Sequence, residues 1–216
     1  MAIANPFEHN YLLHPSNRHL LAGLVAAMGV SYVADSPLSA MLLMLGSLFF
    51  RAPHPASVRG HTYDPGFLYS PCYGTVTDVI TDDTWHTVSV FMSVFDVHVQ
   101  YAPCAGTLVS STHIDGSFEF AQLYRKTRNN TRRVHRFRTE RFGEVDVVQV
   151  AGFLARTIVS FPSAGARMQP GDELGLIRFG SRVDIRVPVN KVKRLLVREG
   201  DIMYGPYSKL AVGLAK

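Results

Sequence analysis

A Gly-Ser pair, Gly180 and Ser181, interrupts an alternating stretch near the end of the chain, IRFGSRVDIRVP at 177–188. Apolar residues occupy every second position on both sides of the pair, as they do in a β-strand with one buried face. Glycine weakens a strand, and it usually marks a bulge, a bend or a close approach of the backbone. The pair therefore indicates either a bulge or the two sides of a bond at which chemistry takes place.

Asp96 and His98 form a second candidate, in the segment FMSVFDVHVQYAP at 91–103. The two residues are two positions apart, so in a strand their side chains lie on the same face. Histidine is the side chain whose ordinary pKa lies closest to neutral pH, which suits it to proton transfer. A histidine in an alternating run is nevertheless more often a structural residue, and an aspartate there can simply end a turn. Both interpretations stay open on these residues alone.

Metal and nucleotide chemistry lack a signature in this sequence. The nine histidines are scattered, neither Cys72 nor Cys104 belongs to a CxxC pair, and there is no Walker loop or dinucleotide fingerprint. We therefore expect no metal site and no dissociable cofactor. Two cysteines also do not make the framework of a disulfide-stapled secreted protein, which favours a reduced, cytosol-facing location.

The elements that position these residues are predicted to be strands. The chain has 216 residues, 47% of them hydrophobic and 18% charged, which is typical of a folded domain with an appendage. From residue 70 onward, short alternating runs are separated by turns, and the pattern Pro-Cys-x-Gly-Thr occurs twice, in SPCYGTV at 70–76 and APCAGTL at 102–108. We expect a mainly β domain over 70–216, sandwich- or barrel-like and pseudo-symmetric, with few short helices.

The N-terminal part has a different character. Two uncharged apolar runs, Leu20–Ala34 and Leu38–Phe50, are separated by Asp35-Ser36-Pro37, and each is shorter than a membrane-spanning helix requires. They are apolar on all sides. We expect residues 1–50 to form a membrane-associated apolar helical hairpin, followed by a Pro- and Gly-rich linker at 51–69. A helical hairpin in the core of a soluble domain is the alternative.

A basic cluster lies at 124–141, where eight Lys or Arg accompany a single acid, Glu140. The net charge of +5 agrees with an anionic partner. Anionic lipid headgroups attract such a segment, and with the apolar runs upstream we favour a membrane over nucleic acid. A solvated basic loop and a nucleic-acid-binding β module remain the alternatives, the second because Tyr124 and Phe137 could stack on bases.

Several segments together resemble a known family. They are FMSVFDVHVQYAP at 91–103, GSFEFA at 116–121, VVQVAGFLAR at 147–156 and GDELGLIRFGSRVDIRVP at 171–188. In order and spacing they resemble the short, archaeal and bacterial type of phosphatidylserine decarboxylase. SLFFRAP at 47–53 is similar to the segment where that family leaves its membrane-associated N-terminus, and SPCYG stands where the family has an SPADG turn. The resemblance covers nearly the whole chain.

The resemblance implies an enzyme that cleaves itself between Gly180 and Ser181 and so makes its own cofactor. Attack of the Ser181 hydroxyl on the preceding carbonyl, elimination and hydrolysis would leave a covalent pyruvoyl group on an α chain, 181–216, separate from a β chain, 1–180. That ketone condenses with the amine of a serine phospholipid and accepts the electrons released with carbon dioxide. The resemblance assigns proton transfer to His98, and Asp96 to orienting or tuning it.

Partners and location follow from the same resemblance. We expect a serine phospholipid as the substrate, a membrane and the complementary chain of the same precursor as partners, and no nucleic acid, while a homo-oligomer is left open. The protein would be membrane-associated, with its catalytic domain facing the cytoplasm.

Two departures from the family pattern support a rival hypothesis. The aspartate of the SPADG turn, which is thought to assist self-cleavage, is replaced by Tyr73, and a phenol is a poor base at neutral pH. The family's Asn-Glu-Arg segment is replaced by Asn130-Thr131-Arg132, so a second carboxylate is missing. The rival is a non-cleaving, catalytically impaired relative that binds lipid at the membrane.

Overall fold

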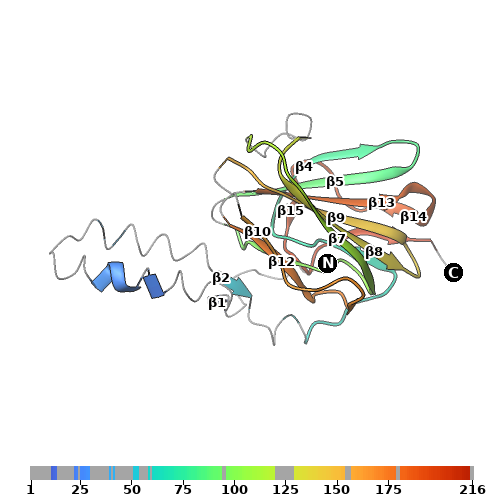
Figure 1. The fold of residues 1–216 in the computed structure, drawn as a ribbon. Helices are drawn as coiled ribbons and strands as arrows, with labels where there is room; N and C mark the ends of the chain where they lie inside the picture. The colour runs from blue at the N-terminus through green and yellow to red at the C-terminus, as the bar shows by residue number, and fades with distance from the viewer. Residues whose placement is uncertain are drawn as a thin grey trace.

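The computed structural model describes residues 11–13, 22–23, 25–29, 39, 41, 51–53, 58, 60–93, 96–119, 129–153, 157–178 and 181–214. Strands dominate these residues (Figure 1). The prediction of a mainly β fold with few helices is therefore confirmed.

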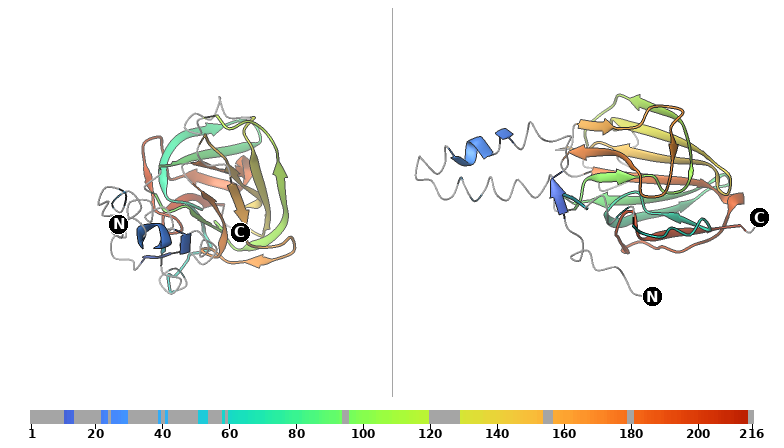
Figure 2. Two further views of the ribbon diagram at one scale, coloured as in Figure 1. Left: turned by 60° about the vertical axis from the view of Figure 1, so that its left-hand side comes forward. Right: turned by 90° about the horizontal axis from the view of Figure 1, so that it is seen from below.

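One curled sheet of eight antiparallel strands makes up most of the domain (Figures 1 and 2). Its strands, in spatial order, are β11 (Arg167–Met168), β7 (Gly106–Ile114), β8 (Arg132–Thr139), β9 (Gly143–Val150), β13 (Ser181–Pro188), β5 (Trp85–Met92), β4 (Gly74–Thr81) and β15 (Ile202–Met203). The central strands β9, β13 and β5 are mostly buried along their length, and they are rich in valine, which favours extended backbone.

Three smaller sheets complete the described strands. One contains β10 (Thr157–Ser160), β12 (Glu173–Arg178) and β6 (Val99–Tyr101), and another contains β14 (Val192–Leu195), β16 (Lys209–Gly213) and β3 (Phe67–Tyr69). The third pairs β1 (Tyr11–Leu13) with β2 (Arg51–Pro53). A 3-10 turn, η5 (Val189–Lys191), connects β13 to β14.

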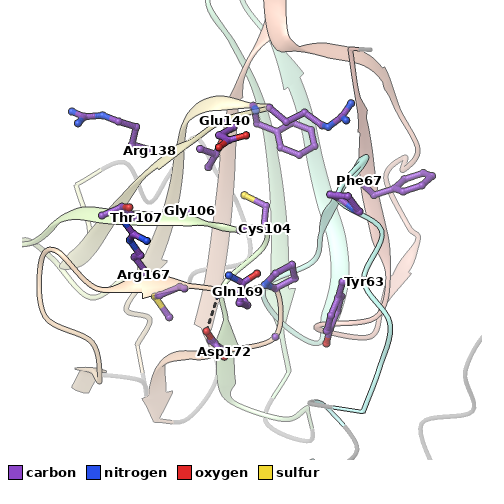
Figure 3. Close-up of a pocket in the computed structure, with 18 of the residues that line it drawn as sticks. Tyr63, Phe67, Cys104, Gly106, Thr107, Arg138, Glu140, Arg167, Gln169 and Asp172 are labelled. Carbon is purple, nitrogen blue, oxygen red and sulfur yellow. Dashed lines mark hydrogen bonds between the residues drawn. The ribbon is translucent and has the colours of Figure 1, made fainter. Parts of the chain in front are cut away.

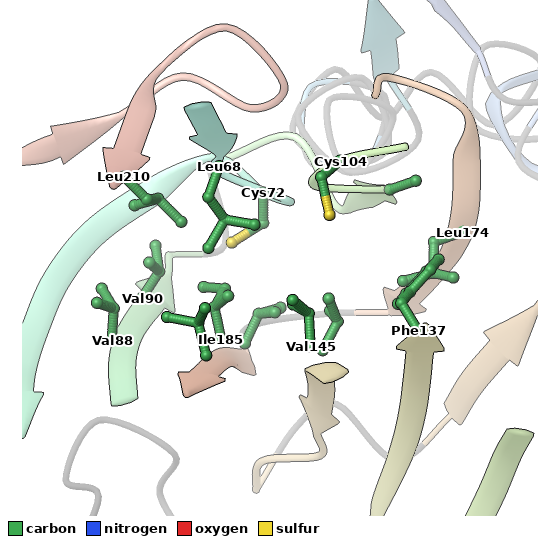
Figure 4. Packing of buried hydrophobic residues seen from close by; sticks show 14 of the residues in the cluster. Leu68, Cys72, Val88, Val90, Cys104, Phe137, Val145, Leu174, Ile185 and Leu210 are labelled. Carbon is green, nitrogen blue, oxygen red and sulfur yellow. The ribbon is translucent and has the colours of Figure 1, made fainter. Parts of the chain in front are cut away.

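The hydrophobic core lies where the eight-stranded sheet faces the two larger three-stranded sheets (Figure 4). Val90, Val145 and Ile185 from the large sheet pack in one cluster with Leu174 of β12 and Leu210 of β16. Their alternation along each strand is what the period-2 pattern predicts. The core therefore ties together the sheets on either side of the Gly-Ser pair.

The repeated Pro-Cys-x-Gly turn marks an internal symmetry. Gly74 begins β4 and Gly106 begins β7, and each glycine is the register partner of a methionine on an edge strand, Met203 on β15 and Met168 on β11. β4 and β7 thus occupy equivalent places, second from either edge of the eight-stranded sheet. The backbone comes close at both turns, because a Cβ on Gly74 would lie 2.2 Å from the Phe91 carbonyl oxygen.

The N-terminal segment is only partly described. Residues 22–23, 25–29, 39 and 41 have helical backbone, and the part of the chain that the structure describes contains no helix long and apolar enough to cross a membrane. The hairpin expected over 1–50 otherwise lies outside the described residues and is not supported by them. β1 and β2 do pair, with Leu13 opposite Arg51, so the chain leaves and re-enters this small sheet at adjacent positions.

The expected division into a hairpin, a linker at 51–69 and a β domain stays a prediction. Within the linker range the structure contains β2 and β3, and β3 pairs with β16. Tyr63 and Tyr69 make an edge-to-face contact with ring centroids 5.0 Å apart. The end of this range therefore packs on the β domain.

Candidate functional site

The chain changes sheets at the Gly-Ser pair. β12 ends at Arg178 in a three-stranded sheet, and β13 begins at Ser181 in the middle of the eight-stranded sheet. Gly180 lies outside the described residues. The interruption in the alternating pattern is thus a transition between two sheets rather than a bulge within one strand.

A second crossing runs beside the first. β5 ends at Met92 in the large sheet and β6 begins at Val99 in the small one, so the chain passes between the same two sheets in the opposite direction. β5 pairs with β13, and β6 pairs with β12. Because both pairs of strands are hydrogen-bonded neighbours, the two predicted motifs must meet at one corner of the domain.

Register and hydrogen bonds define that meeting. Met92 is the Cα partner of Ser181. The backbone N–H of Ile177 donates to the His98 carbonyl oxygen at 3.3 Å, four residues before Ser181. The structure therefore brings His98 and the start of β13 together, although they are far apart in the sequence.

Ser181 is fully buried, and its hydroxyl donates to the sulfur of Met92 with a distance of 3.6 Å between Oγ and Sδ. A thioether is a weak acceptor. The contact holds the hydroxyl in place without drawing strongly on its proton.

Asp96 and His98 belong to one tight turn. The Asp96 carboxylate accepts from the Ser93 N–H at 2.7 Å, while the Asp96 N–H donates to the Ser93 carbonyl at 3.0 Å. The His98 Nδ1 lies 2.7 Å from the Asp96 carbonyl oxygen. A carbonyl can only accept, so Nδ1 carries the hydrogen, and proton exchange at His98 falls to Nε2. The contact of Asp96 with the ring thus runs through its backbone, whereas its carboxylate fixes the turn.

The SPCYG turn lies near the same corner, without a carboxylate of its own. Cys72 is fully buried, and burial raises the pKa of its thiol, with a further contribution from the charge of Asp96. Tyr73 is 5% exposed and packs edge-to-face against Tyr204, with ring centroids 6.5 Å apart. In the second departure from the family pattern, the Thr131 hydroxyl bonds to the backbone of Gly116. Both replacements are accommodated as packed structural residues.

On the outer face of β13, Arg182 and Asp184 form a buried ion pair. The Arg182 Nε donates to Asp184 Oδ1 at 2.7 Å and its Nη2 to Oδ2 at 3.1 Å. The alternating pattern puts both on the face opposite Val183 and Ile185, and this face is covered too, because they are only 2% and 5% exposed. Burial raises the pKa of Asp184 although Arg182 opposes the shift. Both members belong to β13, so each charge is compensated inside the strand that follows Ser181.

Gln100, Gln149 and His135 are fully buried polar residues that the sequence analysis did not single out. A signal for two of them exists in the pattern, since Gln149 falls in the same alternating series as Val145 and Val147, and His135 in that of Phe137. A polar residue at a core position of a strand has to be hydrogen-bonded. One partner of Gln149, Gln100, lies on another sheet, so the pattern could not name it.

Part of the basic cluster is structural. Arg136 makes a bidentate contact with the buried Asp146, at 2.8 and 3.0 Å. Arg186 of β13 approaches the same carboxylate at 3.7 Å. Arg136, Asp146 and Arg186 are register partners on three neighbouring strands, so this row of charges stabilises the sheet.

A cavity of about 880 Å³ lies elsewhere on the domain (Figure 3). Its lining includes Cys104, Arg138 and Arg167, together with Asp172, whose carboxylate accepts from the Gln169 N–H at 2.7 Å. β12 separates it from Ser181, because Glu173 follows the cavity residue Asp172 and Arg178 precedes the Gly-Ser pair, about 17 Å away along the strand. None of the predicted site residues lines this cavity.

Comparisons with known proteins give the family of the chain. The family model described as phosphatidylserine decarboxylase matches residues 45–213. A phosphatidylserine decarboxylase proenzyme of Mycobacterium ulcerans is 37% identical over 188 residues, which cover 82% of this chain and 77% of that protein. Proteins of the same name from Novosphingobium aromaticivorans and Streptomyces avermitilis are 35% and 40% identical, covering 86% and 65% of this chain and 81% and 62% of theirs.

The matched range contains both sheet crossings, the turn with Asp96 and His98, and the whole of β13. The fold, the site and these matches lead to one conclusion: the chain belongs to the phosphatidylserine decarboxylase family.

Proposed function

We propose that this chain decarboxylates phosphatidylserine to phosphatidylethanolamine, with a pyruvoyl group that it makes from Ser181 by cleaving its own backbone. The observation that carries the proposal is the paired sheet crossing, which places Ser181 opposite Met92 and the His98 carbonyl beside Ile177. The proenzyme names of the relatives support the self-cleavage step.

Self-cleavage balances with one water molecule. The Ser181 Oγ attacks the carbonyl carbon of Gly180, the C–N bond breaks, and the hydroxyl proton passes to the freed amine, which converts the amide into an ester. Loss of the Ser181 Cα proton then expels residues 1–180 as a carboxylate and leaves an unsaturated amine. Its tautomer takes up water and releases ammonia, and the ketone that remains is the pyruvoyl group. A serine hydroxyl needs positioning for such an attack because it is a weak nucleophile.

The surroundings of Ser181 fit a pyruvoyl group that is made from this residue. Ser181 begins a strand with hydrogen-bonded neighbours on both sides, β5 and β9, and its side chain faces the thioether of Met92 rather than a charged group. The pyruvoyl group would supply the electron sink for loss of carbon dioxide. Decarboxylation replaces the carboxylate on the serine Cα by a proton. We assign delivery of that proton to His98, whose Nδ1 is held by Asp96 and whose Nε2 exchanges it.

A membrane location is part of the proposal, with the catalytic domain on the cytoplasmic side. The substrate is a phospholipid, and residues 14–50 carry the apolar runs between the paired strands β1 and β2. Val25 and Met41 there are 59% and 52% exposed. Exposed apolar side chains in such a segment favour contact with lipid.

Mass spectrometry of the purified full chain tests the proposal. We expect two chains that split before Ser181, the smaller carrying a carbonyl that reacts with hydrazine, and release of ethanolamine lipid from phosphatidylserine vesicles. Ser181→Ala should give one chain and no product. A single full-length chain with an ordinary serine would overturn the proposal.

The second candidate function is lipid binding without cleavage. The replacement of two family carboxylates by Tyr73 and Thr131 favours it. In that case the full-length chain would float with phosphatidylserine vesicles, and no hydrazine-reactive fragment would form.

A further inference from the structure

A chain of hydrogen bonds crosses the core from β8 to the turn that carries His98. The Nε2 of His135 lies 2.7 Å from Gln149 Oε1, and Gln149 Nε2 donates to Gln100 Oε1 at 2.6 Å. Gln100 Nε2 in turn donates to the His98 carbonyl oxygen at 2.7 Å. Gln149 belongs to the eight-stranded sheet and Gln100 to a three-stranded sheet, so the two fully buried amides join the sheets.

This chain of hydrogen bonds ends next to Ser181. Gln100 Nε2 also donates to Met92 Sδ at 3.5 Å, and this sulfur is the acceptor of the Ser181 hydroxyl. One amide nitrogen therefore contacts both the backbone of His98 and the side chain that holds Ser181.

The His98 carbonyl oxygen fixes the donor and acceptor of every hydrogen bond in this series. The His98 carbonyl can only accept, so Gln100 must present its NH₂ there and its oxygen to Gln149. Gln149 must then present its NH₂ to Gln100 and its oxygen to His135, whose Nε2 must carry the hydrogen. Neutral imidazole suits this role, and burial lowers the pKa of His135 to about 4. No member can rotate its amide without losing a partner.

The fold also makes room for the bridge. Gly175 is the register partner of Gln100, and a Cβ at this position would lie 3.1 Å from Gln149 Nε2 and 2.1 Å from the Val159 carbonyl oxygen. A glycine in the middle of β12 thus leaves space for the Gln149 amide at the point where it meets Gln100.

We propose that Gln100 and Gln149 are positioning residues for self-cleavage, which rests on the function proposed above. Acting through Met92 and the His98 backbone, they hold the two sheet crossings in one fixed relation, so that the Ser181 hydroxyl meets the preceding carbonyl. Small displacements of reacting groups lower rates by large factors. Loss of the Gln149 amide would leave Gln100 with one partner fewer and free to turn away from His98.

Self-cleavage of the full chain, synthesised in a cell-free system with liposomes, measures this role. The readout is conversion of labelled precursor into its two fragments over time, compared only among variants with the far-UV and near-UV circular dichroism of the unchanged chain. We expect Gln149→Met to cleave about 10-fold or more slowly. Thr139→Val is the matched control, because it removes two other hydrogen bonds of the same sheet, one to the Gly143 carbonyl and one from the Phe142 N–H, and it should cleave at the unchanged rate.

Gln149→Glu separates positioning from simple destabilisation. An ionised carboxylate cannot donate to Gln100, whereas the protonated acid can, and burial raises the pKa of such a group. The cleavage rate of Gln149→Glu, divided by that of the unchanged chain, should therefore rise as the pH is lowered. The corresponding ratio for Gln149→Met should not change with pH.

The outcomes distinguish the two proposals. If the unchanged chain cleaves and Gln149→Met cleaves within about twofold of it, the positioning role is wrong and the proposed function stands. If Gln149→Met does not fold, a pH-independent ratio for Gln149→Glu overturns the positioning role. If the unchanged chain does not cleave, both proposals fail.

Discussion

Met92 and Ser181 are register partners on the neighbouring strands β5 and β13, and the Ser181 hydroxyl donates to the Met92 sulfur. Each residue stands where its strand leaves or enters the eight-stranded sheet. The relationship explains why two motifs so far apart in the sequence occur together. One supplies the serine, and the other supplies both the strand that holds it and the turn that carries His98.

His98→Ala should abolish formation of the ethanolamine lipid, with a loss of at least about 100-fold per mole of cleaved chain, because general acid catalysis contributes that much or more. Product is measured by lipid chromatography, and the cleaved fraction by electrophoresis. His86→Ala is the control, since His86 lies on β5 and bonds to the Thr81 hydroxyl at the surface. Full turnover in His98→Ala would remove His98 from the mechanism.

Asp96→Asn should lower turnover by less than about 10-fold, and Asp96→Ala by more. The asparagine side chain retains an oxygen that can accept from the Ser93 N–H, so it preserves the turn that aims the Asp96 carbonyl at His98. Alanine releases that turn. Equal and large losses in both variants would show instead that the carboxylate charge acts directly.

The pH dependence of stability should report His135. Its pKa falls from 6.5 to about 4 on folding because the ring is buried, so between these values the unfolded chain binds more protons. The contribution of His135 to the free energy of unfolding should be complete above about pH 6.5. It should decline toward pH 4, by about 3 kcal/mol in total.

Urea unfolding at several pH values measures this loss. Ser181→Ala provides an uncleaved background, and His135→Gln in that background should flatten the dependence. Because all other titrating groups are common to both chains, an equal slope in the two would contradict the assignment.

Replacement of residues 14–50 by a short Gly-Ser turn should abolish flotation with anionic liposomes while self-cleavage continues. The pairing of Leu13 with Arg51 allows such a closure. Flotation and electrophoresis of the same sample measure both properties. Unchanged flotation would place membrane binding on the β domain, and loss of cleavage would give residues 14–50 a role in folding.

The β-rich fold and the two motifs could be predicted because period-2 patterns and local turns are written in adjacent residues. The sheet change at Ser181 could not, because Ile177 before the pair and Val183 and Ile185 after it fall in the same alternating series. The contact between Gln100 and Gln149 was equally hidden, since it joins two sheets and depends on the space at Gly175. The burial of Arg182 and Asp184 could not be predicted either, because the strand pattern does not say what covers the face opposite Val183 and Ile185.

Ser181 opens a strand that is hydrogen-bonded on both sides, to β5 and to β9, in the interior of a large sheet. Chain ends usually fray unless they are tied down, and an end created by cleavage before Ser181 would be held by the pairing of Ser181 with Met92 and of Arg182 with Val150. The proposed α chain would also stay hydrogen-bonded in two sheets, through β13 and β15 in the eight-stranded sheet and through β14 and β16 in a three-stranded sheet. Cleavage would therefore leave the core and the strand pairing intact, and the new N-terminus would be held like a residue inside a strand.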